Sequence, residues 1–331
     1  MLTCLLVLRC RSDVRGVRWL RVTAPLQLPQ RSGTGGKLLA AVLTLLAFCA
    51  LTLLSISAYL LYRALAPETT PIRIAPESLL GDPARIEYLA PDGTTRDGWL
   101  FPGRRGAPTI VLAHGYQSSR ADLLPLAASL QENRFNVFLF DFSGHGNSPG
   151  RTTLGFAETR ELLGVIATLA QQPDLDPERF GVWGTNLGAY AALAAAAHEP
   201  RIRALAVGSV YDHPEMLLRA QVDRIGLGTL PLVHACTRWG FRLVHWSDRT
   251  TLPLSATIDR LGGSAKLFIR PLDDPLLGEV TLQLFLRAPE PKQQEVVQKG
   301  GYVNMLDTEK RSYEARIVSF FLQYLPVTVS R

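Results

Sequence analysis

The stretch from Arg179 to His198 holds the residue best placed to take part in chemistry. It reads RFGVWGTNLGAYAALAAAAH, an apolar run that turns through Gly184 and Gly188 directly into an alanine-rich segment. This pattern predicts a strand, a sharp turn and a helix, because the two glycines allow the strand and helix backbones to pass close together. Asn186 stands at the centre of the turn, where the backbone needs an unusual φ that asparagine tolerates better than most residues. An amide has no hydroxyl to deprotonate, so Asn186 cannot serve as an activated nucleophile.

The spacing of Gly184, Asn186 and Gly188 resembles the GxSxG nucleophile elbow of the α/β-hydrolase superfamily, in which a strained turn exposes a serine hydroxyl above the sheet. The resemblance covers about residues 85–325 and is greatest to the serine-aminopeptidase and monoacylglycerol-lipase-like branch. It implies that the elbow geometry is kept while the nucleophile is lost, since Asn186 stands where the family has serine.

A second motif, His114-Gly115, follows the apolar run TIVLA. In the hydrolases that the chain resembles, such a loop supplies one oxyanion-hole amide and the residue after the nucleophile supplies the other. The resemblance assigns these two amides to Tyr116 and Leu187. Backbone N–H groups do not depend on side-chain identity, so this anion-binding feature can persist without a serine. The downstream sequence DFSGHGNS resembles the superfamily loop D-x-x-G-H-G-x-S, and we interpret its His145 as a structural residue.

The acid position of the resembling family falls on a turn that follows a predicted strand. The run KLFIR, residues 266–270, has strand character and leads into the turn 271–275, which holds Asp273 and Asp274. In the family the catalytic acid sits in an Asp-rich turn of this kind. Asp274 is the better match, and Asp273 stays open as the alternative.

The histidine of the resembling family corresponds to Tyr302, which follows Gly300 and Gly301. A phenol with a pKa of about 10 is neutral near physiological pH and is a poor general base, whereas an imidazole with a pKa of about 6.5 is well suited. The order nucleophile, acid, base becomes Asn186, Asp274, Tyr302, so only the acid is retained. Because a buried amide left unpaired costs about 1 to 3 kcal/mol, we expect Asn186 to hydrogen-bond to Tyr302 or Asp274.

Short apolar runs alternate with helical patterns through most of the chain. This alternation is typical of a doubly wound sheet with right-handed crossovers. We predict an α/β fold, a doubly wound and mostly parallel sheet of the α/β-hydrolase type with a small helical lid, preceded by one transmembrane helix. The predicted strands are an antiparallel pair at residues 85–89 and 94–101, followed by 109–113, 136–140, 204–209, 266–270 and 293–298.

The predicted lid lies between the strands 204–209 and 266–270. About 55 residues separate these strands, well beyond the usual connection of about 2 to 6. The segment, about residues 212–264, is rich in apolar and aromatic residues such as Trp239, Phe241 and Trp246. We predict a helical lid over the site, with ordinary core packing or contact with a membrane surface as the alternatives.

The positive charge is concentrated in the N-terminal arm. Residues 1–37 hold seven basic residues and one acidic residue, a net charge of +6, and the rest of the chain balances at 28 basic and 28 acidic residues. The globular part therefore lacks the basic excess that binds nucleic acid, and we expect no nucleic-acid partner.

The segment Leu38 to Tyr62 runs for 25 residues without a charge. At about 1.5 Å per residue, a helix of this length can cross a hydrocarbon core of about 30 Å. We predict a basic cytoplasmic arm (1–37), a transmembrane helix (38–62), a tether (63–84) and a hydrolase-fold domain (85–331). The positive-inside rule keeps the arm in the cytoplasm, so the domain lies on the non-cytoplasmic side. The alternative is a cleaved signal peptide, because Ala64-Leu65-Ala66 looks like a cleavage site, although Pro67 directly after it would hinder processing.

The four cysteines do not form a disulfide framework. Cys4 and Cys10 lie in the arm, Cys49 lies in the predicted span, and Cys236 is alone in the domain. We therefore predict no disulfide within the domain, and we expect no metal site and no cofactor.

Three functions remain open at this point. Loss of two of the three catalytic groups favours a membrane-anchored pseudo-hydrolase that binds a small apolar or acyl ligand, or a protein partner, through the former active-site pocket. The alternative is an active serine-type hydrolase, an esterase, lipase or peptidase, that uses displaced groups such as Ser118, Ser143 or Ser209 with His213. The third is a membrane-proximal structural module, which predicts a filled cleft.

Overall fold

The structure of the protein is a computed structural model that describes residues 34–68, 81–226 and 230–327. The chain divides into two compact units, residues 1–49 and 50–331, and the second unit holds the sheet with its helices. The arm up to residue 33 and residues 69–80 of the predicted tether lie outside the described residues.

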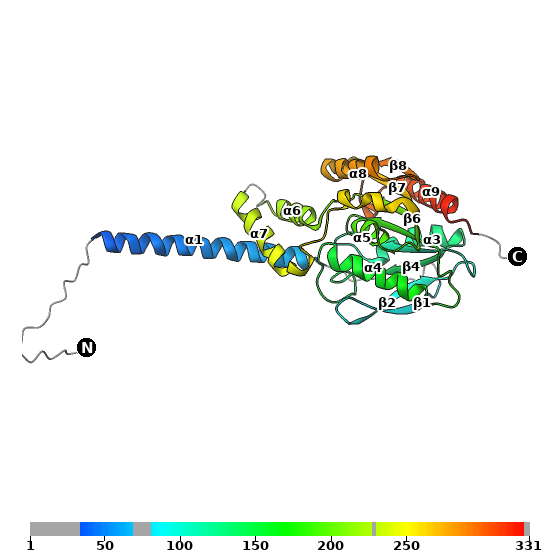
Figure 1. Cartoon of the computed structure of the whole chain (residues 1–331), viewed down its shortest axis with the longest axis horizontal. Coiled ribbons are helices and arrows are strands. Elements are labelled where there is room, and N and C mark those ends of the chain that lie inside the picture. Colours follow the sequence, from blue (N-terminus) through cyan, green and yellow to red (C-terminus); the bar gives the residue numbers. More distant parts are fainter. Residues whose placement is uncertain (1–33, 69–80, 227–229, 328–331) are drawn as a thin grey trace, which may run out of the picture. The chain divides into compact units, whose positions relative to one another are not determined.

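Eight strands form one sheet in the described part of the chain, in the order β1-β2-β4-β3-β5-β6-β7-β8 (Figure 1). β2 pairs antiparallel with β1 and β4, and every other neighbouring pair is parallel. The predicted mostly parallel α/β sheet is confirmed. The strands are β1 (Ala84–Leu89), β2 (Thr95–Phe101), β3 (Thr109–Ala113), β4 (Asn136–Phe140), β5 (Phe180–Thr185), β6 (Ile202–Gly208), β7 (Ala265–Pro271) and β8 (Lys292–Val297).

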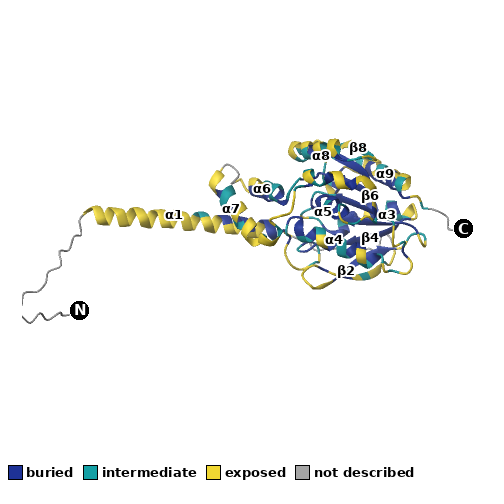
Figure 2. Ribbon diagram, in the orientation of Figure 1, coloured by how far each residue is buried: buried dark blue, intermediate teal, exposed yellow. Residues whose placement is uncertain are grey.

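Helices cover both faces of the sheet. They are α3 (Leu124–Glu132), α4 (Phe156–Leu169), α5 (Leu187–Ala196), α6 (Pro214–Arg224), α7 (Pro231–Val244), α8 (Pro275–Arg287) and α9 (Asp307–Tyr324). Val111 and Ala113 of β3 pack into the core formed with α4 and α5, whereas Ile110 and Leu112 pack into the core formed with α3 and α9. Successive strand residues point to opposite faces, so the two cores lie on opposite sides of the sheet. Figure 2 shows the strands and the inward helix faces as buried.

The register of the parallel strands brings their carboxyl ends to one edge. Ala113 at the end of β3 pairs with Gly184 of β5, and Gly208 at the end of β6 pairs with Thr185 of β5 and Ile269 of β7. Ligands of open α/β sheets bind outside this carboxyl edge. The loops predicted to carry the site therefore start from the same place.

The connection between β6 and β7 is helical, as predicted for the lid. It contains α6 and α7, followed by short 3-10 turns at Trp246–Asp248, Leu254–Ala256 and Ile258–Gly263. Two further 3-10 turns lie at Arg120–Leu123 and Tyr302–Asn304, next to loops that carry site residues.

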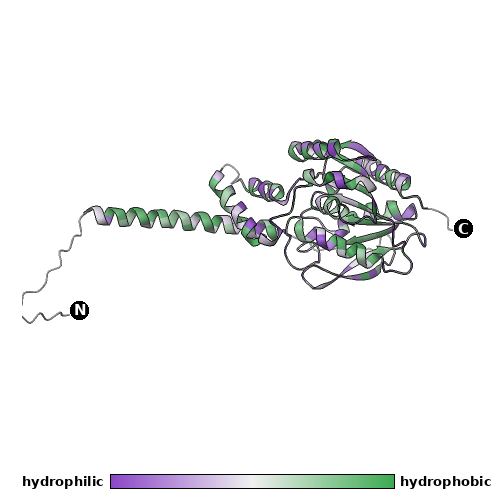
Figure 3. Cartoon of the chain, viewed as in Figure 1, coloured by the Kyte–Doolittle hydropathy of each residue, from purple (hydrophilic) through white to green (hydrophobic). Residues whose placement is uncertain are grey.

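One apolar helix precedes the sheet, α1 (Thr34–Leu65), which is coloured almost entirely hydrophobic in Figure 3. It is long and apolar enough to cross a membrane, and a signal sequence near the N-terminus would have the same character. The helix continues past Tyr62, and its last turns are buried within the second unit, where Leu60, Ala64 and Leu65 are 1%, 2% and 6% exposed.

Candidate functional site

The turn from β5 into α5 has the geometry of a nucleophile elbow. Asn186 adopts φ 51° and ψ −108°, the positive φ that the turn requires. A Cβ at Gly184 would lie 2.5 Å from the Gly188 carbonyl carbon, and one at Gly188 would lie 2.0 Å from the Ala113 carbonyl oxygen. These two positions therefore exclude every side chain, which is why the glycine spacing could be read from the sequence.

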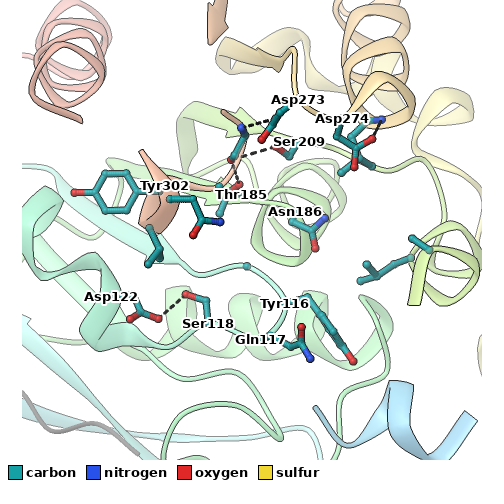
Figure 4. A pocket seen from close by; sticks show the side chains of 18 of the residues that line it. Tyr116, Gln117, Ser118, Asp122, Thr185, Asn186, Ser209, Asp273, Asp274 and Tyr302 are labelled. Carbon is teal, nitrogen blue, oxygen red and sulfur yellow. Dashed lines mark hydrogen bonds between the residues drawn. The ribbon is translucent and has the colours of Figure 1, made fainter. Parts of the chain in front are cut away.

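A cavity of about 710 Å³ lies over the elbow, at the carboxyl edge of the sheet (Figure 4). Its volume is typical of small-molecule sites, and it contradicts the filled cleft that a purely structural module predicts. We call this cavity the elbow pocket. It is lined by residues 115–119 after β3, by Thr185 and Asn186, by Ser209, by Asp273 and Asp274, by residues 300–304, and by Met216, Leu217, Ala220, Gln221 and Arg224 of α6.

The side chain of Asn186 projects into the elbow pocket (Figure 4). Its backbone N–H donates to the Gly208 carbonyl at 2.9 Å, but its carboxamide makes no hydrogen bond among the described residues. The expected bond from Asn186 to Tyr302 or Asp274 is therefore wrong. Both of those side chains already have partners elsewhere, and the half-buried amide faces the open volume of the pocket instead.

Tyr302 does not present its phenol to Asn186. Its ring points away from the elbow (Figure 4), is 2% exposed and packs edge-on against Trp183 at a centroid distance of 5.7 Å. Its hydroxyl donates a 2.5 Å hydrogen bond to Oε1 of Glu314 in α9. Burial and the Glu314 carboxylate raise the pKa of Tyr302 above its usual value, so the phenol stays protonated and cannot act as a base. From the same loop, Val303 lines the pocket and is 52% exposed.

The two candidate acids differ in what they contact. Asp274 caps the N-terminus of α8, where its Oδ1 accepts from the Leu277 N–H at 3.0 Å. Asp273 reaches the loop after β8 and accepts from the Gly300 N–H at 2.9 Å. An acid in a triad orients the base on that loop, so the geometry favours Asp273 over the better sequence match Asp274.

The amides predicted for the oxyanion hole are available for a ligand. Neither the Tyr116 nor the Leu187 N–H donates a hydrogen bond within the described residues. Leu187 is the first residue of α5, where the free N–H groups and the helix dipole favour an anionic group. A Cβ at Gly115 would lie 3.3 Å from the Thr185 Cγ2, so the loop after β3 passes directly beside the elbow.

Comparison with known sequences gives the family. Residues 110–312 match the sequence model described as the alpha/beta hydrolase family. The chain belongs to this family.

Curated relatives match part of the chain. It is 32% identical over 124 residues to thiohydrolase aneE of Aspergillus aculeatus, which covers 36% of this chain and 39% of that protein. It is 30% identical over 132 residues to polyketide transferase grgF of a Penicillium species, covering 38% of this chain and 45% of that protein. An uncharacterised Escherichia coli K12 protein, YfhR, is 32% identical over 110 residues, which cover 31% of this chain and 38% of that protein. The chain thus spans less than half the length of these curated relatives.

Solved hydrolase structures share the fold. The Pyrococcus furiosus esterase Pf2001 aligns with a TM-score of 0.63 at 20% identity, over 79% of this chain and 98% of the esterase. The α/β hydrolase GrgF from a Penicillium species aligns with a TM-score of 0.57 at 20% identity, over 73% of this chain and 98% of that protein. At this identity the likeness establishes the architecture, and the chemistry has to be argued from the residues of this hydrolase-family chain.

His114 and His145, the histidines of the loops after β3 and β4, are structural here and do not line the elbow pocket. His114 is buried, bonds through Nδ1 to the Gly115 carbonyl at 2.8 Å, and accepts from the Phe142 N–H through Nε2 at 3.0 Å. Both ring nitrogens are thereby used by the neutral imidazole, and burial lowers the pKa of His114 to about 4. His145 is also buried, its Nδ1 lies 3.1 Å from the Ser143 carbonyl, and burial lowers its pKa to about 3.

The displaced serines of the active-hydrolase hypothesis are not paired with a histidine. Ser118 donates to Asp122 at 2.8 Å and Ser209 donates to the Gly300 carbonyl at 3.2 Å. Ser143 is bonded to Glu161 at 3.0 Å in a buried ionic cluster away from the pocket. His213 caps α6 and lines a different, smaller cavity. Within the described residues no serine hydroxyl is bonded to an imidazole, and no group of three or more metal-ligating side chains is arranged around a common point.

Two features of the site were not predicted from the sequence. The first is the hydrogen bond from Tyr302 to Glu314. Glu314 lies within the helix α9, and nothing in the local sequence indicates that its carboxylate is buried against a tyrosine. The side chain of Tyr116 lines the pocket and reaches α1, where its hydroxyl donates to the Ala64 carbonyl of the last turn at 2.9 Å. The neighbouring Thr152 N–H donates to the Leu65 carbonyl at 3.0 Å. The end of the apolar helix is thus bonded to the loop that carries Tyr116, one of the two residues whose amides were predicted to form the oxyanion hole.

Proposed function

We propose that the protein is a membrane-anchored pseudo-hydrolase that binds a ligand through the elbow pocket without turning it over. One observation carries this proposal. An amide, Asn186, takes the nucleophile position in an open pocket, and no histidine lines that pocket in the described part of the chain. With neither a hydroxyl to attack nor an imidazole to take its proton, acyl transfer lacks both chemical groups.

The pocket chemistry supports a ligand that combines a carbonyl or carboxylate with an apolar chain. The free amides of Tyr116 and Leu187 and the unpaired carboxamide of Asn186 can donate to an oxygen. Leu217 and Leu277 supply apolar wall on the α6 and α8 sides. An acyl compound fits both parts, since binding pockets are mostly apolar with a few convergent polar groups.

Anchoring by α1 is the second part of the proposal. The helix has the length and the apolar composition of a membrane span, and its buried C-terminal turns make it a part of the folded domain. The basic arm supports an orientation with the N-terminus in the cytoplasm and the pocket on the other side. Protease protection in sealed vesicles tests the orientation, and a mature N-terminus beginning after Ala66 would show that α1 is a cleaved signal peptide instead.

The absence of turnover can be tested with a fluorophosphonate probe and a small activated ester. We expect no stoichiometric adduct on any serine of the full-length chain and no ester hydrolysis above the buffer rate. A stoichiometric adduct on Ser118, Ser143 or Ser209 would support the active-hydrolase alternative and contradict the proposal.

Ligand binding can be tested with a photoreactive fatty acid that carries a diazirine on its chain. We expect crosslinks to peptides that line the elbow pocket, and competition by an excess of oleate. Ala220→Trp should abolish the labelling, because Ala220 lines the pocket and the indole would fill it. Arg219→Trp is the matched control, since the adjacent side chain is 75% exposed. Equal labelling of both variants would place the binding site outside the elbow pocket.

A further inference from the structure

Helix α7 of the lid carries two distinct apolar surfaces. Its packed surface contains Val233, Thr237 and Phe241, which are 3%, 1% and 1% exposed. Its second surface contains Leu232, Trp239 and Leu243, which are 68%, 58% and 65% exposed. With about 100° of rotation per residue, these three side chains fall within about 40° of one another. We call this second surface the α7 stripe. Arg238 and Arg242 lie beside this stripe, about 100° around the axis of the same helix.

The packed surface of the lid lies against α1. Val222 of α6 and Val233 of α7 form a buried cluster with Leu60, and Leu53 packs against that cluster. Gly240 of α7 faces Leu61, where an added Cβ would lie 3.2 Å from the leucine side chain. Ser57 of α1, 4% exposed, and Thr237 place small polar residues in this region, as is common where helices pack within membranes.

The length of α1 sets how deep this contact lies. Residues 38–52, the apolar part that precedes Leu53, extend about 22 Å at about 1.5 Å per residue, which is less than the roughly 30 Å of a hydrocarbon core. A span therefore has to include the turns that carry Leu53 and Ser57, which are the turns covered by the lid. The first turn of α7, which carries Leu232 and Val233, then lies at the level of the bilayer.

We propose that the α7 stripe is inserted into the lipid bilayer beside α1, so that the lid is a membrane-embedded part of the protein. This rests on the membrane anchoring proposed above. Apolar side chains next to the α1 contact are also exposed, as a lipid environment requires: Ile225 after α6 and Leu230 before α7 are each 48% exposed. The order of residues also fits. Leu232 lies in the first turn of α7. Trp239, Trp246 and the arginines Arg238 and Arg242 follow it, and these residue types gather at membrane interfaces.

The consequence concerns the elbow pocket. The other lid helix, α6, lines that pocket through Leu217, Gln221 and Arg224 while its Val222 packs on Leu60 of α1. A lid seated in lipid brings the pocket to the membrane surface. An acyl ligand can then pass between the bilayer and the pocket without crossing water.

Site-specific fluorescence tests the proposal on the full-length chain. Cys4, Cys10, Cys49 and Cys236 are replaced by alanine, and a polarity-sensitive dye is attached at Leu232→Cys or at Leu89→Cys. Leu89 is the matched control, because it is 64% exposed and lies on the edge strand β1. The proteins are reconstituted into phosphatidylcholine vesicles with or without nitroxide-labelled acyl chains.

We expect blue-shifted emission at position 232, quenching by the acyl nitroxide and protection from aqueous iodide, with the reverse at position 89. If both positions are quenched by iodide alone while the chain floats with vesicles after an alkaline wash, the stripe lies in water. That result overturns this inference and leaves the anchoring intact. A chain that fails to float overturns both. Protection of position 232 from both quenchers indicates a protein partner or a second copy on the stripe and also overturns the inference. Leu243→Cys samples the same stripe if Leu232→Cys does not fold.

Discussion

The Tyr302 hydroxyl donates a 2.5 Å hydrogen bond to Glu314, and this bond turns the residue at the predicted base position into the core of the domain. Trp183 lies edge-on against the same ring, so both the polar and the apolar parts of the tyrosine are accounted for outside the pocket. The loop that would carry a catalytic histidine therefore presents Val303 to the pocket, while the Tyr302 hydroxyl is directed to Glu314.

Reintroduction of the catalytic groups should distinguish the two loop positions. We expect Asn186→Ser combined with Val303→His to hydrolyse a small activated ester at least about tenfold faster than Asn186→Ser alone. A positioned general base contributes about 10² to 10⁴, and an unoptimised geometry loses part of that. Asn186→Ser with Tyr302→His should show no gain, because the imidazole would sit in the core. Fluorophosphonate labelling at position 186 and a cooperative melt of each variant show that the serine is reactive and the fold is kept. Equal ester rates from the two double variants would contradict the assignment of Val303 as the position that faces the pocket.

The acid position can be resolved in that reactivated background. Asp273→Asn should remove most of the recovered turnover, since Asp273 is the carboxylate bonded to the loop at Gly300. Asp274→Ala should keep the turnover and lower the free energy of unfolding by about 1 kcal/mol, because it removes the cap of α8. Ester kinetics and thermal melts on the same preparations test both statements, and the opposite pattern would restore Asp274 as the acid.

Tyr116→Phe tests the bond between the pocket loop and the apolar helix. The variant loses the 2.9 Å hydrogen bond to the Ala64 carbonyl, which lies in the last turn of α1 and has no intrahelical donor. We expect the free energy of unfolding to fall by about 1 kcal/mol, while labelling by the photoreactive fatty acid is unchanged because the Tyr116 amide remains. Tyr59→Phe, at an exposed position of the same helix, serves as the control. A loss of labelling without a loss of stability would assign the hydroxyl to ligand binding.

Stability should decrease on acidification. The pKa of His114 is lowered to about 4 in the folded protein from 6.5 when unfolded, so the unfolded state takes up its proton first as the pH falls. Stability is then fully present above about pH 6.5, decreases by up to about 1.4 kcal/mol per pH unit for this group, and levels off below about pH 4. His145, with a pKa lowered to about 3, acts in the same direction.

Denaturant unfolding at several pH values checks the histidine assignment. His114→Gln should be less stable near neutral pH and should show a weaker dependence on pH, since one of the titrating groups is gone. The exposed His198→Gln should leave both unchanged. If His114→Gln keeps the full slope, the acid sensitivity originates elsewhere.

Local patterns in the sequence determined the family fold, the elbow and the apolar helix. Gly184 is required by the backbone of Gly188 four residues later, whereas Gly188 is required by the distant backbone of Ala113; the spacing of the two glycines is nevertheless a local pattern. The apolar runs of β3 to β7 have the length and composition of buried strands. Such features depend largely on steric and hydrophobic rules that act within a short window, so the mostly parallel sheet, the positive φ at Asn186 and the span-length helix could be anticipated. The identity of Asn186 as a residue without nucleophilic chemistry is likewise a property of its side chain alone.

Only the tertiary structure decided where the remaining side chains point. Tyr302 turns inward because Glu314 and Trp183 are available in the core, and Asp273 faces the pocket loop because Asp274 is used to cap α8. These outcomes depend on partners that are distant in sequence or on a choice between adjacent residues, which spacing cannot rank. The burial of the end of α1 by the lid follows the same reasoning. An apolar helix can bury its side chains against any apolar surface. The packing of α6 and α7 decides which turns of α1 contact the domain, through Val222 and Val233 against Leu60.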